Sequence, residues 1–189
     1  MTSTETIKTA RDMGQYFHPI IVTKKEKLEF NPHNFYEGLK LMEHSYFGVP
    51  MVEVIMQYLH DKETDKPHLV WMGDYGGPID IEVNGEPQHI QFSNCVNYAP
   101  SIRYYNTYRY IINHDKKEYV DLVKCRENSD VHPLPLLTAN GNGQGGGDYL
   151  GSDMDLVGSW AGDRIAVADS LTGKAAKYTE LKPNFKEEY

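Results

Sequence analysis

The sequence has little cysteine: only Cys95 and Cys125, and neither stands in a Cys-x-x-Cys or Cys/His pattern. We therefore exclude a disulfide-stabilised scaffold and a zinc finger, and interpret both residues as ordinary reduced thiols. The sequence also lacks an Asn-x-Ser/Thr glycosylation site and any apolar run near the roughly 20 residues of a membrane-spanning helix. Residues 1–12 are polar and lack the apolar stretch of a secretory signal peptide. These absences predict a cytoplasmic protein with no membrane association.

A basic surface stripe is missing as well. The net charge is −8, and the basic residues are scattered apart from a short run at 24–27. Non-specific binding to nucleic acid requires clustered Lys and Arg, because these residues displace the counterions of the phosphate backbone. We therefore expect no nucleic-acid partner.

Recognised catalytic motifs are also absent. The sequence contains no Gly-x-Ser-x-Gly elbow, no His-Glu-x-x-His pair and no phosphate-binding loop that ends in Lys-Ser/Thr. Its eight histidines are dispersed. We interpret His44, which follows Glu43 at a predicted helix end, as stabilised by the helix dipole or as a buried partner before considering it a base. The sequence therefore does not favour an enzyme, and it identifies no cofactor and no set of metal ligands.

The composition that is present fits one globular domain. The chain has 189 residues, of which 40% are apolar and 24% charged. It is therefore long and apolar enough to bury a core without disulfides or a structural metal. We predict a flexible leader over residues 1–12, a single domain over 13–169 and a polar, partly ordered tail over 170–189.

Local patterns predict an α+β fold, mainly an antiparallel sheet with one or two helices, at about residues 32–60, packed on one face. Asn31-Pro32 and Pro50 are helix-start signals, and apolar residues follow each at helical spacing. A hairpin is predicted over residues 79–92, since Asn84-Gly85 tolerates the positive φ of a type I′ turn. Other strands are expected at 17–23, 28–30, 68–72, 102–112 and 119–123, with a polar loop at 125–130 and an extended segment at 131–137.

Both tryptophans of the chain stand in the same tetrapeptide, Trp-x-Gly-Asp, at residues 71–74 and 160–163. One interpretation is turn chemistry, in which Trp anchors a strand end, Gly supplies an unusual φ and Asp caps the turn. The alternative places both turns at one end of the sheet, where Asp74 and Asp163 would line a shared site. Two carboxylates placed together could bind a cation or shift each other's pKa.

Residues 140–149 form the most unusual segment, with five glycines in the seven positions 141–147. The segment contains Gly-x-Gly-x-x-Gly, but the turn-forming residues that follow would not start the helix that a dinucleotide-binding motif requires. Two interpretations remain: a structural loop that needs positive φ and close packing, or a cradle whose backbone amides bind an anionic or polar ligand. The residues of this candidate cradle are Asn140, Gly141, Asn142, Gly143, Gln144, Gly145, Gly146, Asp148 and Tyr149.

Several longer stretches carry a family resemblance: residues 13–17 (MGQYF), 38–45 (GLKLMEHS), 115–121 (DKKEYVD), 132–149 (HPLPLLTANGNGQGGGDY) and 156–165 (LVGSWAGDRI). Together they resemble an uncharacterised family of small proteins found in bacteria and their phages. The resemblance covers residues 13–168, and the family members begin at the position of Met13, so residues 1–12 look like an extension. It implies no activity, only a bacterial or phage origin and a cytoplasmic setting, which for a phage protein is the host cytoplasm.

The leading hypothesis is a non-catalytic binding protein whose ligand is a small polar or nucleotide-like molecule, or a host protein. Its contacts would come from the glycine-rich loop and from six further residues: His44, Trp71, Asp74, Trp160, Asp163 and Arg164. A second hypothesis is a metal-assisted hydrolase or transferase that uses the Asp residues of the glycine-rich and Trp-Gly-Asp turns. A third is a structural, virion-associated component, and homo-oligomerisation stays open.

Overall fold

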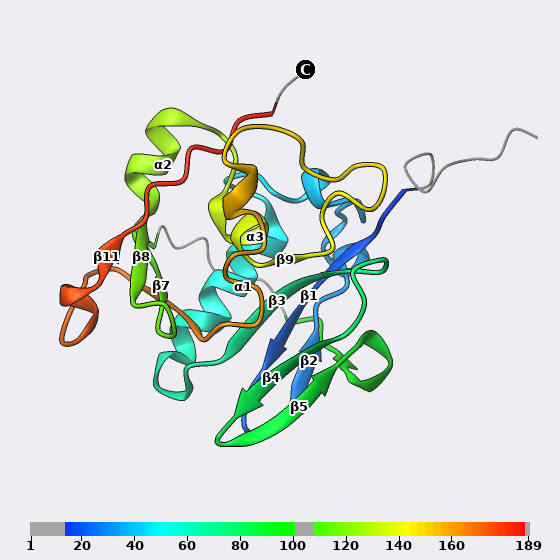
Figure 1. Ribbon diagram of the computed structural model, residues 1–189, viewed down its shortest axis with the longest axis horizontal. Coiled ribbons are helices and arrows are strands. Elements are labelled where there is room, and N and C mark those ends of the chain that lie inside the picture. The colour runs from blue at the N-terminus through cyan, green and yellow to red at the C-terminus, as the bar shows by residue number, and fades with distance from the viewer. Residues whose placement is uncertain (1–13, 101–107, 188–189) are drawn as a thin grey trace, which may run out of the picture.

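The protein has an α+β fold, as predicted, in a computed structural model that describes residues 14–100 and 108–187 (Figure 1). Its strands form a five-stranded sheet in the order β6-β2-β1-β3-β9, a four-stranded sheet in the order β10-β7-β8-β11, and the separate hairpin β4-β5. The longer pairings are antiparallel, whereas the short pairings β2–β6, β3–β9 and β8–β11 are parallel. The mainly antiparallel sheet structure expected from the sequence is therefore confirmed.

The α-helices of the described residues are α1 (Pro50–Asp61), α2 (Leu122–Asn128) and α3 (Pro133–Leu137). The strands are β1 (Phe17–Val22), β2 (Lys27–Glu29), β3 (His68–Gly73), β4 (Ile79–Val83), β5 (Glu86–Ile90), β6 (Val96–Asn97), β7 (Tyr110–Asn113), β8 (Glu118–Asp121), β9 (Ala139–Asn140), β10 (Ile165–Ala168) and β11 (Thr179–Glu180). Among the described residues, none of the helices is both long and apolar enough to cross a bilayer.

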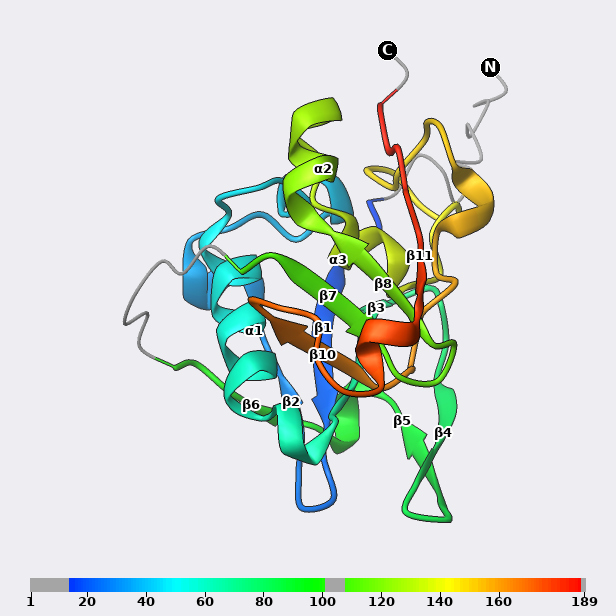
Figure 2. The same ribbon diagram turned by 90° about the vertical axis from the view of Figure 1, so that its left-hand side faces the viewer.

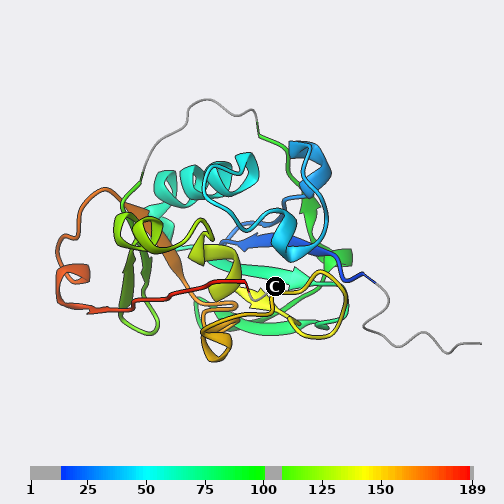
Figure 3. The same cartoon turned by 90° about the horizontal axis from the view of Figure 1, so that it is seen from above.

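The central strands β1 and β3 are covered on both faces. Because side chains alternate along a strand, each of these strands contributes to two apolar clusters. One cluster is the main core, shared with α1, α3 and the second sheet, and the other lies under the β4–β5 hairpin. Viewed from above, α1 and the hairpin lie on opposite sides of these two strands (Figure 3). The hairpin is thus a separate layer over the outer face of the five-stranded sheet.

The C-terminal segment covers the second sheet. Ala166 and Ala168 of β10 turn away from the main core and pack against Ala175. The segment of residues 170–187, expected to be a partly ordered tail, also contributes β11, which pairs with β8, and its Phe185 is only 2% exposed (Figure 2). Residues 1–12, expected to be a leader, lie outside the described residues.

The predicted helical region at 32–60 contains one α-helix, within the one or two expected, preceded by two 3₁₀ turns. Asn31 does cap a helical start, since its side chain accepts a hydrogen bond from the His33 amide at 3.0 Å. That start is a single 3₁₀ turn, Pro32–Phe35, which ends at Tyr36 with φ 61°. A second 3₁₀ turn, Leu41–Glu43, follows, and only α1 is a full helix. The left-handed Tyr36 ends the first turn, so the apolar spacing beyond it does not reflect a helix.

Two further expectations are wrong, because α2 and α3 occupy the predicted polar loop and the predicted extended segment. Asp121 caps α2 by accepting from the Val123 amide, and His132 caps α3 by accepting from the Leu134 amide. The prolines at 133 and 135 lie in the first turn of α3, where backbone N–H groups have no partner within the helix. Proline is therefore tolerated there, and it does not indicate an extended edge.

The predicted hairpin is confirmed, with β4 and β5 joined by Asn84 and Gly85 at φ 56° and 83°. The strand predicted at 102–112 is found as β7, which begins at Tyr110. The part of that prediction at 102–107 lies outside the described residues.

Candidate functional site

The two Trp-Gly-Asp turns lie at opposite ends of β3. Asp74 follows the C-terminal end of this strand, whereas the Asp163 carbonyl accepts a hydrogen bond from the Leu69 amide at its N-terminal end. Six residues of strand separate the two ends by ~17–20 Å, since a strand rises about 3.3 Å per residue. The prediction of a shared site for Asp74 and Asp163 is therefore wrong.

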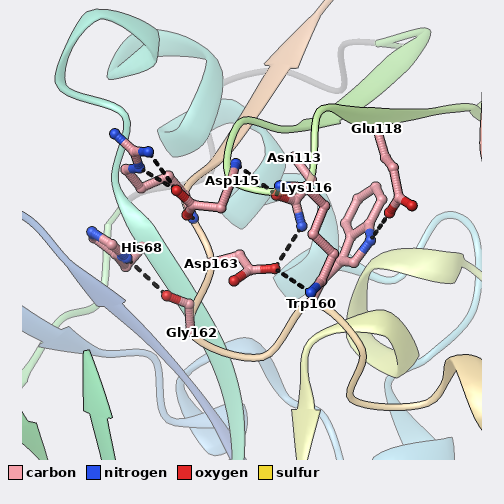
Figure 4. Close-up of polar contacts among 9 residues, drawn as sticks. His68, Asn113, Asp115, Lys116, Glu118, Trp160, Gly162 and Asp163 are labelled. Atoms are coloured by element: carbon pink, nitrogen blue, oxygen red, sulfur yellow. Dashed lines mark hydrogen bonds and ion pairs between the residues drawn. The ribbon is translucent and has the colours of Figure 1, made fainter. Parts of the chain in front are cut away.

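Both tryptophan side chains are fully buried and hydrogen bonded inside the protein. The Trp71 indole donates to Nδ1 of His44 at 3.0 Å, and the Trp160 indole donates to Glu118 at 2.9 Å (Figure 4). Asp74 accepts from the Tyr16 amide at 3.0 Å and donates its own amide to the Tyr16 carbonyl at 2.9 Å, so it ties its turn to the segment before β1. The anchoring role of tryptophan in the turn interpretation is therefore found in both turns, but the positive φ is found only at Gly162, and neither Asp side chain caps its own turn.

His44 lies in the core beside Trp71. Its ring is 0% exposed, and burial lowers its pKa to about 3, against a smaller raising effect of a backbone hydrogen bond with Leu39. Because Nδ1 accepts from Trp71, the ring is held in one tautomer at neutral pH. His44 is therefore a core residue. Its ring is not exposed to solvent, so a ligand cannot reach it in this conformation.

The glycine-rich loop binds an aspartate of its own. Oδ2 of Asp148 accepts hydrogen bonds from the amides of Gly143, Gln144 and Gly145 at 2.6, 2.8 and 3.0 Å. The side chain of Asn142 bonds both backbone groups of Tyr149, whose ring is buried. The amides that a ligand cradle would use are thus already occupied by a carboxylate of the chain.

The glycines of this loop also allow close packing against three other segments. A Cβ on Gly145 would collide with Gln15, one on Gly147 with Lys40, and one on Gly141 with the backbone of Gly76. The carbonyl of Gly146 accepts from the Gln15 amide, and the side chain of Asn140 donates to the Gly77 carbonyl. The loop therefore connects the N-terminal strand, the segment before α1 and the turn after β3.

A polar cleft of about 680 Å³ lies between the tip of the β4–β5 hairpin and the body of the protein, at the second Trp-Gly-Asp turn. Five segments form it: the end of β1, the turn before β3 with the start of β3, strand β4 with its turn, the β7–β8 turn, and the turn at 161–164. Its lining residues are Val22, Thr23, Lys24, Thr64, Asp65, Lys66, His68, Asp80, Ile81, Glu82, Val83, Asn84, Gly85, Asp115, Ala161, Gly162, Asp163 and Arg164. Of the residues predicted for a site, only Asp163 and Arg164 line this cleft.

The charged side chains on the floor of the cleft are held in place by second partners (Figure 4). Oδ2 of Asp163 accepts from Asn113 at 2.8 Å and lies 3.7 Å from Nζ of Lys116. The Asp115 carboxylate accepts two hydrogen bonds from Arg164: one from its backbone amide at 2.7 Å and one from Nε of its guanidinium at 2.8 Å. Burial would raise the pKa of Asp115, but these Arg164 hydrogen bonds outweigh it and the pKa is lowered. Asp115 thus stays ionised and keeps Arg164 oriented.

His68 also lines the cleft, and sequence reasoning missed it. The residue is 8% exposed, and its Nδ1 donates to the Gly162 carbonyl at 2.8 Å. That bond leaves Nε2 as an acceptor, with no hydrogen-bond partner among the described residues. Its position three residues before Trp71, at the start of the strand that ends in the first Trp-x-Gly-Asp turn, was the available sequence signal. His68 lines the cleft because the start of β3 pairs with the second Trp-Gly-Asp turn, which is distant in the sequence.

The described residues contain no group of three or more His, Cys, Asp or Glu side chains arranged to hold a metal ion. The Asp residues named for a metal-assisted enzyme are also distributed over three places: the far end of β3, the glycine-rich loop and the cleft. Comparisons with protein-family models, with curated proteins and with solved structures gave no match. The function is therefore inferred from the geometry of the cleft.

Proposed function

We propose that this protein is a non-catalytic binding protein and that its ligand occupies the cleft beside the β4–β5 hairpin. The observation that carries this proposal is the convergence of fixed polar groups in a cleft of about 680 Å³, within the size range of ligand sites. His68 is held by Gly162, Asp163 by Asn113, and Arg164 by Asp115. Side chains held by second partners lose little freedom on binding, which favours recognition.

Two acceptors on the floor of the cleft indicate part of what the ligand offers. Nε2 of His68 and Oδ1 of Asp163 have no hydrogen-bond partner among the described residues, so both are open acceptors. The ligand therefore carries hydrogen-bond donors, as both a small polar or nucleotide-like molecule and a segment of a host protein do. The resemblance to bacterial and phage proteins supports a bacterial or phage origin, with action in the cytoplasm, for this proposal.

A thermal-shift screen tests the proposal. The panel contains nucleotides, cyclic nucleotides, nicotinamide-type metabolites and mixed short peptides. A compound at about a hundred times its dissociation constant stabilises the fold by ~2.7 kcal/mol. For a chain of this size that corresponds to a rise in Tm of roughly 5–10 °C.

Two matched variants then place the ligand in the cleft. His68→Asn keeps a donor for the Gly162 carbonyl but removes the Nε2 acceptor, whereas His33→Asn makes the same change on the exposed surface. We expect the ligand-induced rise in Tm to fall sharply in His68→Asn and to be unchanged in His33→Asn. A rise that survives His68→Asn, or a panel that produces no rise, contradicts the proposal.

A further inference from the structure

Strand β4 has an open edge that forms one wall of the cleft. Within the described residues β4 pairs only with β5, so its other edge has no neighbouring strand. Six consecutive residues, 80–85, line the cleft, as expected where the edge of a strand and not one of its faces forms the wall. An unpaired edge presents backbone donors and acceptors that can pair with another chain.

The hairpin register identifies the outward-facing backbone groups. A two-residue type I′ turn joins residues that form a hydrogen-bonded pair, so the register Val83↔Glu86 around Asn84-Gly85 makes this pair a bonded one. Antiparallel pairs alternate between bonded and non-bonded positions. The N–H and C=O groups of Asp80 and Glu82 therefore point away from β5, into the cleft.

The other edge of the hairpin is blocked. Pro87 stands opposite Glu82 at a non-bonded position, so it occupies a place where β5 would otherwise present an outward N–H. Proline at such a position prevents another strand from adding to that edge. Strand β4 has no proline, so the hairpin is protected on the side away from the cleft and open on the side that lines it.

The charge of the cleft selects the chemistry of a partner strand. Of its five acidic residues, Asp115 and Asp163 already pair with Arg164 and Lys116, so the carboxylates available to a strand beside β4 are those of β4 itself, Glu82 and Asp80, the latter also bonded to His89. Asp80 and Glu82 lie on the outer face of β4, since Ile79 and Ile81 turn toward the sheet below. Directly opposite residues on neighbouring strands favour opposite charges. A strand added here would carry Lys or Arg beside Asp80 and Glu82.

We propose that the occupant of the cleft is an extended segment of a partner protein, with Lys or Arg at alternate positions, which adds as a strand to the edge of β4. Main-chain hydrogen bonds to Asp80 and Glu82 provide the docking, and the alternate basic side chains provide the selectivity. About five residues span β4, a length of ~17 Å. This inference rests on the proposed function, because it names the ligand of the same cleft.

Selection from a displayed library of random decapeptides tests the inference, followed by binding measurements on an enriched peptide. We expect enriched sequences with Lys or Arg at every second position. N-methylation of alternate residues removes donors from one edge of the peptide and leaves its charge unchanged. Two such peptides are made, one methylated at the odd and one at the even positions. For the one whose methyl groups face β4, the dissociation constant should rise at least tenfold. Hydrogen exchange of the Asp80 and Glu82 amides should slow in the complex.

Two variants at one position separate edge pairing from charge attraction. Glu82→Pro removes the outward donor without touching the bonds of β4 to β5, whereas Glu82→Gln removes only the charge. We expect Glu82→Pro to abolish peptide binding and Glu82→Gln to weaken it a few-fold, with the melting temperature confirming that both variants fold. If Glu82→Pro does not fold, the methylated peptides make the same test from the ligand side.

Equal binding of both methylated peptides, or unchanged exchange at Asp80 and Glu82, overturns strand addition. An absence of enriched sequences also overturns it. If a small molecule nevertheless raises Tm in a way that depends on His68, the proposed function stands and only the peptide inference fails. If neither peptides nor small molecules bind, both proposals fail.

Discussion

At the scale of single residues, Asp148 occupies the position that a bound anion takes in a glycine-rich ligand site. Its carboxylate accepts three consecutive backbone amides, all from the segment that looked like a cradle. The composition of the loop predicted that glycines were needed and that amides would converge. It could not predict what the amides bind, because a carboxylate inside the loop and one on a ligand satisfy them equally well.

The contacts of Asp148 predict that Asp148→Asn lowers the free energy of unfolding by ~1–3 kcal/mol. The amide oxygen remains an acceptor, but hydrogen bonds to a charged group are stronger than those to a neutral one. Urea unfolding measures the change, with Asp155→Asn, at an exposed position of the following turn, as the control. If the two variants are equally stable, the carboxylate does not hold the loop.

At the scale of elements, the sequence predicted those whose determinants are local and missed those whose determinants are capping interactions. The hairpin was predicted because Asn84-Gly85 alone sets its turn, and α1 because Pro50 and a buried face share one segment. Helices α2 and α3 were missed because each is short and depends on a side-chain cap, from Asp121 or His132, that composition does not reveal.

The packing of the hairpin on the second Trp-Gly-Asp turn predicts a difference between two Gly→Ala variants. Gly77 and Gly162 both have positive φ, 70° and 80°, so alanine strains the backbone similarly at each. A Cβ at Gly77 would meet no atom, whereas one at Gly162 would lie 2.9 Å from Ile81 and 3.1 Å from Ile79 of β4.

We expect Gly77→Ala to cost ~1 kcal/mol of unfolding free energy and Gly162→Ala ~2–4 kcal/mol, the excess being the overpacking term. Urea unfolding of both variants gives the difference directly. If both variants lose the same unfolding free energy, the hairpin moves away from an added Cβ at Gly162 without penalty, and β4 is not a rigid wall of the cleft.

At the scale of the whole molecule, the candidate site arises from contacts between distant parts of the chain. His68 and Gly162, 94 residues apart, are joined because the second turn pairs with the start of β3. Sequence patterns placed Asp163 and Arg164 among the site residues, but they could not assign the two Trp-Gly-Asp turns to opposite ends of one strand. Only the strand pairing, which depends on the whole core, separates Asp74 from Asp163.

Burial of histidine in this core predicts that the protein loses stability as the pH falls below about 6.5. His44 and His132 are 0% and 2% exposed, and burial lowers the pKa of each to about 3. Above pH 6.5 both are neutral in the folded and the unfolded chain, so they contribute no pH dependence. Below it the unfolded chain binds protons that the folded chain does not, which favours unfolding. Each histidine contributes up to ~1.4 kcal/mol per pH unit in this range.

Urea unfolding at several pH values between 6.5 and 5 measures this slope, in a range where unperturbed carboxylates remain mostly ionised. Burial also lowers the pKa of His114, to about 4, so this residue adds to the slope in the same direction. Glu37 and Glu53, whose pKa burial raises, act in the opposite direction and reduce the total. His132→Asn preserves a cap for α3, since Asn is a good N-cap residue, and removes one of the three histidines whose pKa burial lowers. We expect this variant to lose about a third of the histidine slope, whereas His33→Asn leaves it unchanged. A slope that is identical in both variants would show that His132 is protonated as readily in the folded chain as in the unfolded one.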